Sequence, residues 1–138
     1  MEQGPAPVSI LRQGPNLVAS IHTALDDSQM VRFRHDLIHA IGDQRARGVI
    51  IDVAALDVLD SFGSSTLRDI AEMARLRGAR TVVVGIQPDV AFAMVRLGMS
   101  TGNIPTALDF EEGLAFLDGR TKGRGLDLGK PKRPSGRG

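Results

Sequence analysis

The chain has 138 residues, of which 42% are hydrophobic and 24% charged, and these values fit one compact globular domain rather than a disordered protein. It has no cysteine, which excludes disulfides, thiol catalysis and thiolate metal sites, and its 4% of aromatic residues leaves few stacking surfaces for single-stranded nucleic acid. The charge is uneven, because the residues from Gly119 onward carry +6 and those before it −5.

The N-terminal third predicts a β-hairpin followed by a helix. Residues 8–12 and 17–21 are short apolar runs, and residues 13–16 between them have the composition of a turn. Residues 26–28 supply side chains that cap a helix, and Gly48 marks either its end or the start of the next strand. The helix is recognised by one apolar stripe at helical spacing, formed by Met30, Phe33, Leu37 and Ile41.

The middle of the chain alternates strands with helices. Residues 49–53 are nearly all β-branched, which is typical of a strand covered on both faces. A helix is predicted from the region of Ser61 to near Gly78, with apolar residues Leu67, Ile70, Ala71 and Ala74 on its inner face. Residues 81–84 form a second β-branched run and lead to Pro88, which fits the first turn of another helix.

The C-terminal part predicts one more short strand and one more helix. Gly98 ends the preceding helix, residues 103–107 are a candidate strand, and Asp109 with Glu112 forms a capping box. We therefore expect an α/β fold: a mixed, mostly parallel sheet of four to five strands with about four helices in a single domain over residues 1–118. Residues 119–138 are rich in glycine, proline and basic residues, and they predict a disordered tail.

The candidate functional group is the hydroxyl of Ser61. It lies where a buried strand leads into a helix, and such junctions carry functional groups in parallel sheets. If Asp60 or Ser61 caps the helix, the hydroxyl sits at the positive end of the helix dipole. A phosphate there would add about −1.5 to −2 charges beside Asp57 and Asp60, and it would repel an acidic partner. The alternative is that Ser61 is simply the helix cap.

Four sequence pieces together resemble a known family. They are Asp60-Ser61-Phe62 after the buried strand, Gly85-Ile86-Gln87-Pro88, the Leu97-Gly98 helix end, and residues 106–109. In this order they resemble the STAS-domain antagonists of bacterial stress signalling, the single-domain scaffold proteins of the stressosome. The likeness runs from about Val8 to Leu117 and implies a single STAS domain.

The resemblance implies a non-enzymatic, cytoplasmic regulator without a cofactor. Such a protein sequesters a serine/threonine switch kinase inside a large assembly shared with STAS-domain sensor paralogues. Carried over, Ser61 is the residue that the kinase phosphorylates, phosphorylation releases the kinase, and a phosphatase resets the state. The residues implied to bind the partner near this switch are Asp60, Phe62, Ser64 and Ser65.

Two features depart from this pattern. The helix start Gly63-Ser64-Ser65 is more similar to the anti-anti-sigma factors, which bind a kinase-type anti-sigma protein and are released when the same serine is phosphorylated. An anti-anti-sigma factor is therefore the alternative function. The basic tail belongs to neither pattern; it is either a solubilising extension or a weak contact for nucleic acid or anionic lipid.

Other functional classes lack their required residues. A receiver domain needs a lysine after a later strand, yet no lysine precedes Lys122, and no Gly-Lys-Ser/Thr segment forms a P-loop. His35 and His39 have the spacing of a metal pair but lack the zincin glutamate, so they are better explained as two histidines on a polar helix face. We expect no catalytic residue and no metal site. No apolar run approaches about 18 residues and no signal peptide is recognisable, so we expect no membrane partner.

Overall fold

The computed structural model of the chain describes residues 6–99 and 104–119. Strands and helices alternate along these residues after an initial hairpin, as the sequence predicts. The elements are β1 (Val8–Gln13), β2 (Asn16–Ile21), α1 (Asp27–Gln44), β3 (Gly48–Asp52), α2 (Ser61–Leu76), β4 (Arg80–Val84), α3 (Pro88–Arg96), β5 (Thr106–Ala107) and α4 (Phe110–Leu117).

The five strands form one mixed sheet in the order β1-β2-β3-β4-β5. β1 runs antiparallel to β2, and every other neighbouring pair is parallel. In the register of the central strands, Ile50 lies between Val18 and Val82. Because β2, β3 and β4 run in the same direction, their carboxyl ends share one edge of the sheet, and α2 and α3 begin beyond that edge.

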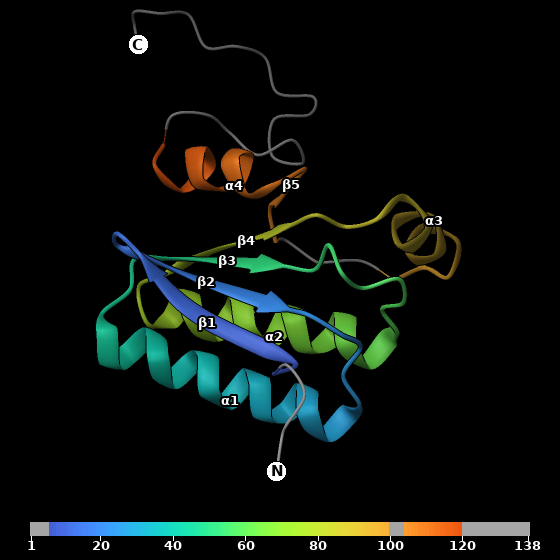
Figure 1. Ribbon diagram of the computed structural model, residues 1–138, viewed down its shortest axis with the longest axis horizontal. Helices are drawn as coiled ribbons and strands as arrows, with labels where there is room; N and C mark the ends of the chain where they lie inside the picture. Colours follow the sequence, from blue (N-terminus) through green and yellow to red (C-terminus); the bar gives the residue numbers. More distant parts are fainter. Residues whose placement is uncertain (1–5, 100–103, 120–138) are drawn as a thin grey trace, which may run out of the picture.

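The helices divide between the two faces and one end of the sheet (Figure 1). α1 and α2 lie side by side on one face, α4 lies on the other face against β3 and β4, and α3 lies beyond the carboxyl ends of the strands. Two apolar cores result. The larger, between the sheet and α1 and α2, includes Phe33, Leu37, Ile51, Leu67 and Ile70; the smaller, under α4, includes Ile50, Val82, Val84 and Phe116.

Some element ends differ from the sequence prediction. α1 ends at Gln44 because Arg45 adopts a left-handed conformation with φ 52°, and its N–H and that of Ala46 turn back to Gly42 and Ile41. Gly48 is the first residue of β3; a Cβ there would collide with Asn16. The last strand is shorter than predicted, since β5 contains two residues.

Other predictions concern the burial of the helices, membrane spans and the basic tail. The apolar stripe of α1 is buried as expected, whereas Ala71 of α2 is only partly buried. Within the described residues, no helix has both the length and the hydropathy that a bilayer span requires. Apart from Gly119, the predicted basic tail lies outside the described residues.

Candidate functional site at the start of helix α2

The connection from β3 to α2 is held against the core by its apolar residues. Leu56 and Leu59 are buried, and the N–H of Val53 donates to the carbonyl of Val84 at 3.0 Å, which ties the connection to the neighbouring strand. The chain thus enters α2 at a fixed place beyond the sheet edge. The position of Ser61, the first residue of α2, follows from this anchoring.

The N-cap of α2 is Asp60. Its Oδ1 accepts a hydrogen bond from the N–H of Gly63 at 2.8 Å, and its carbonyl accepts from the N–H of Ser64 at 2.9 Å. Both atoms therefore fix the first turn of the helix. Because Asp60 caps the helix, Ser61 does not, and the alternative that treats Ser61 as a simple helix cap is wrong.

The Ser61 side chain is exposed and weakly held. Its hydroxyl donates to the sulfur of Met99 at 3.5 Å, and a thioether is a weak acceptor. Among the described residues, the backbone N–H groups of Ser61 and Phe62 have no hydrogen-bond partner, so they contribute positive potential beside the hydroxyl. The hydroxyl is thus accessible and lies where an attached anion would be stabilised.

A groove of about 290 Å³ runs beside Ser61, between the β3–α2 connection and α3. Its floor is apolar and its rim carries three carboxylates, from Asp57, Asp60 and Asp89. The full lining is Asp57, Val58, Leu59, Asp60, Ser61, Asp89, Val90, Ala93, Leu97 and Met99.

Exposed apolar side chains extend the groove onto the surface. Leu97 is 72% and Val58 64% exposed at the groove, whereas the exposed Phe92 and Val95 of α3 are not part of its lining. Exposed apolar side chains in an acid-rimmed groove are typical of a protein-binding surface. Sequence analysis did not predict that α3 forms one wall of this groove, because Val90, Ala93 and Leu97 are far from Ser61 in the sequence.

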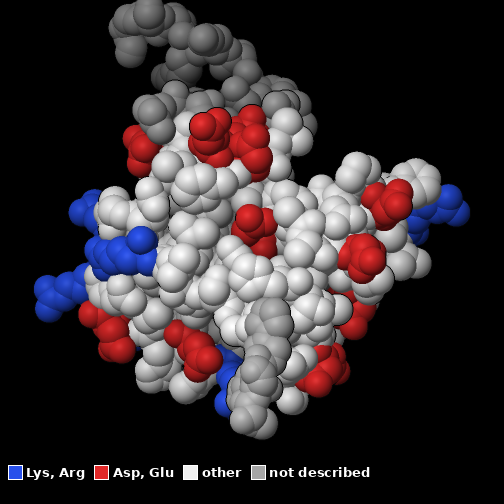
Figure 2. Space-filling model, viewed as in Figure 1, with Lys and Arg blue, Asp and Glu red and all other residues white. Residues whose placement is uncertain are grey.

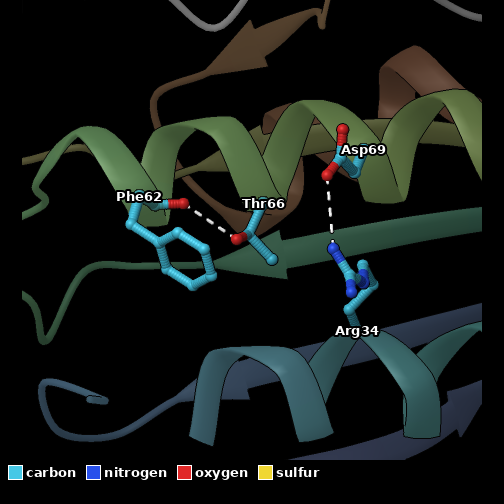
Figure 3. Close-up of polar contacts among 4 residues, drawn as sticks. All are labelled: Arg34, Phe62, Thr66 and Asp69. Carbon is cyan, nitrogen blue, oxygen red and sulfur yellow. Dashed lines mark hydrogen bonds and ion pairs between the residues drawn. The ribbon is translucent and has the colours of Figure 1, made fainter. Parts of the chain in front are cut away.

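The partner residues predicted from the resemblance lie in different environments. Asp60 is exposed, Phe62 is 37% exposed and Ser65 is partly buried. Figure 3 shows the Phe62 ring projecting from the first turn of α2. The backbone carbonyl of Phe62 accepts a hydrogen bond from the Thr66 hydroxyl at 2.8 Å. Ser64 is only 1% exposed, with its hydroxyl facing the Met99 sulfur at 4.0 Å, so it adds no exposed surface beside Ser61.

The two histidines lie apart from this site. His35 and His39 are exposed on α1, with ring centroids 4.3 Å apart and planes tilted by 37°. His35 also faces Asp36, 3.6 Å from its carboxylate. Within the described part of the chain, no group of three or more histidines and carboxylates is arranged to hold a metal ion.

Comparisons with known proteins agree with this fold. The profile of the STAS domain family matches residues 8–113. A serine-to-glutamate variant of Moorella thermoacetica RsbS is 32% identical, with a TM-score of 0.72, over 83% of this chain and 97% of that chain. A chain from "Molecular architecture of the stressosome, a signal integration and transduction hub" is 29% identical, with a TM-score of 0.66, and the match covers 83% of this chain and 99% of that one.

A curated relative matches over a shorter share of its own length. The RsbT co-antagonist protein RsbRA of Bacillus subtilis is 24% identical over 106 residues, which are 77% of this chain. The chain spans 39% of RsbRA, so the likeness concerns one part of that protein.

Proposed function

Because the chain belongs to the STAS domain family and is related to the stressosome proteins RsbS and RsbRA, we propose that it is a scaffold antagonist that sequesters a serine/threonine switch kinase. The antagonists of this family are regulators without catalytic activity. In this proposal the unphosphorylated chain holds the kinase, and phosphorylation of Ser61 by that kinase releases it. A phosphatase restores the binding form.

One observation carries the proposal: the Ser61 hydroxyl is exposed at the start of α2 and on the rim of the groove. A phosphate at Ser61 would add about −1.5 to −2 charges to a rim that already has the carboxylates of Asp57, Asp60 and Asp89. Where the partner presents an acidic surface to this rim, like charges forced together across the interface cost several kcal/mol. A hundredfold loss of affinity requires only about 2.8 kcal/mol, so this repulsion is large enough to release a partner.

The same phosphate should leave the fold intact. At the first residue of α2 it meets the N–H groups of Ser61 and Phe62, which have no partner among the described residues, and anions near a helix N-terminus contribute about 0.3–1 kcal/mol of stability. This gain opposes the repulsion from Asp60. The effect of phosphorylation is thus expected on binding rather than on folding.

Likeness to RsbS and RsbRA supports the proposed partners. The RsbRA name describes a co-antagonist of RsbT, and we extend this relation to STAS-domain sensor paralogues that share an assembly with the present chain. A large assembly needs surfaces beyond the groove. Mixing the chain with such paralogues and measuring static light scattering tests this part: very large particles are expected, and a mixture that stays at the mass of its separate components would contradict it.

The first test is the site of phosphorylation. Purified chain incubated with its kinase and ATP should gain one phosphate by intact-mass spectrometry, and peptide mapping should place it on Ser61. Ser28→Ala is the matched control, because Ser28 is an exposed serine in the first turn of α1 that does not line the groove, and its loss should change nothing. A phosphate that remains after Ser61→Ala would contradict the proposed site.

The second test separates charge from side-chain size. Ser61→Asp adds a carboxylate, and Ser61→Asn adds a neutral group of the same size at the same place. We expect Ser61→Asp to lose the kinase in pull-downs, Ser61→Asn to retain most of it, and Ser61→Ala to hold it permanently even with ATP. Equal loss by Asp and Asn would show that bulk, not charge, releases the kinase.

The anti-anti-sigma alternative rested on Gly63 and the serines after it. The structure gives Gly63 a local reason: a Cβ there would lie 2.9 Å from Leu59 Cδ1 and 3.2 Å from Asp60 Oδ1. A side chain at this position would crowd Leu59 and the cap, so glycine has a local packing role and does not by itself distinguish one partner class from the other. A stable complex with a kinase-type anti-sigma protein, together with no assembly with paralogues, would favour the alternative.

A further inference from the structure

A second pocket lies at the other end of α2, away from Ser61. It has a volume of about 370 Å³ and is formed where α1 and α2 end and β3 begins. We propose that this pocket binds the phosphate group of a small phosphomonoester. Its lining consists of three arginines and small or apolar residues: Ile41, Gly42, Arg45, Ala46, Arg47, Arg77 and Gly78.

The backbone that carries the arginines is fixed. Arg45 and Arg77 are the C-cap residues of α1 and α2, with N–H groups bonded back to Gly42 and Ala74. The N–H of Arg47 donates to the carbonyl of Pro15 at 2.8 Å, and its own carbonyl accepts from Arg80 at 3.1 Å. All three arginines thus line one pocket from a fixed backbone, which limits the backbone ordering needed on binding a ligand.

Their charge is not balanced within the described residues. No side-chain hydrogen bond or ion pair joins Arg45, Arg47 or Arg77 to a described residue, and the lining includes no acid. By contrast, Arg34 and Arg75 pair with acidic side chains. In Figure 2 several basic side chains lie at the left, where α1 and α2 end in Figure 1, and others lie at the right and at the lower edge.

The negative ends of the two helix dipoles offset only part of this positive charge. The C-terminal ends of α1 and α2 each supply about −0.5 charge, or about −1 together, against the three positive guanidinium groups. The guanidinium of Arg12 also donates to the Gln44 carbonyl and so satisfies one carbonyl of α1. A surplus of about +2 remains, which matches the −1.5 to −2 charge of a phosphomonoester at neutral pH.

Gly42 creates room for one of the arginines. The guanidinium of Arg77 lies over Gly42, so that a Cβ at this position would collide with it. Glycine inside a helix is about 1 kcal/mol less favourable than alanine, yet here the missing side chain lets Arg77 lie against α1. A planar guanidinium group can donate two parallel hydrogen bonds to two oxygens of one phosphate. The pocket volume falls in the range of small-ligand sites.

The test is an NMR titration of the full chain with inorganic phosphate at constant ionic strength. Backbone amide shifts are expected in residues 41–48 and 77–80. Arg47→Gln and Arg77→Gln should each weaken binding about fivefold or more, since each removes a charged hydrogen-bond donor. Arg96→Gln is the matched control: Arg96 is an exposed arginine of α3, outside the pocket, and affinity should stay unchanged.

Gly42→Ala separates position from charge. It keeps all three arginines and should raise helix stability, but it moves the Arg77 guanidinium; phosphate affinity should therefore fall while the melting temperature stays equal or rises. Binding as tight as wild type in Gly42→Ala and Arg77→Gln, or equal weakening by Arg96→Gln, would overturn the proposal. So would phosphate-dependent shifts confined to the basic tail. None of these outcomes depends on the function proposed for Ser61.

Discussion

Asp60→Ala tests whether the first turn of α2 depends on one side-chain oxygen. The substitution removes the 2.8 Å hydrogen bond from the N–H of Gly63, a residue that is itself buried. Loss of an N-cap costs about 1 kcal/mol, and an unsatisfied buried donor costs about 1–3 kcal/mol, so we expect a loss of about 1.5 kcal/mol. For a domain of roughly 110 residues this lowers the melting temperature by about 6 °C.

The assay is thermal unfolding followed by circular dichroism. Asp60→Asn retains an oxygen that accepts the same bond, and it should shift the melting temperature by about 2 °C or less. Asp57→Ala is the matched control, because Asp57 is a neighbouring exposed aspartate without a hydrogen bond or ion pair to the described residues, and its loss should have little effect on stability. A wild-type melting temperature in Asp60→Ala, or equal destabilisation by Ala and Asn, would refute the capping argument.

Three further predictions concern packing and charge. The hydroxyl oxygen of Thr81 is buried without a partner among the described residues, so Thr81→Val should raise the free energy of unfolding by about 1 kcal/mol in urea titrations. A Cβ at Gly113 would lie 2.6 Å from Val84 Cγ1, so Gly113→Ala should lower the same free energy by about 1–3 kcal/mol; an unchanged value would contradict the packing of α4. Arg75, through a 2.6 Å hydrogen bond and its charge, holds the pKa of Glu72 below its usual value. The stability that this ion pair contributes to the folded state is therefore lost as the pH falls through that lowered pKa. NMR titration of the carboxyl group should show the pKa of Glu72 rising towards its usual value in Arg75→Gln.

The sequence predicts the fold well because burial dictates where apolar residues occur along each strand and helix. The β-branched runs at 49–53 and 81–84 can be covered on both faces only in a central sheet, and they became β3 and β4. The stripe of α1 from Met30 to Ile41 is buried for the same reason. By contrast, the left-handed end of α1 at Arg45 could not be predicted, since arginine has no special preference for that conformation.

The functional surfaces were harder to predict because they combine distant parts of the chain. The acidic rim of the groove needs Asp57 from the β3–α2 connection and Asp89 from the first turn of α3, and the arginine pocket needs Arg47 beside Arg77. Ser64 shows a second limit: serine is small enough for both core and surface, so composition alone does not reveal that its side chain is buried.

The N-cap assignment has a consequence for timing. Asp60 caps the helix, so the neighbouring Ser61 hydroxyl is not needed for the cap. A chemical group could be attached to it or removed from it while breaking only its weak hydrogen bond to the Met99 sulfur. Under the proposed function, the domain itself then imposes no slow conformational step on the cycle. The dwell time in each state would be set by how often the modifying enzymes encounter the chain, and thus by their cellular concentrations.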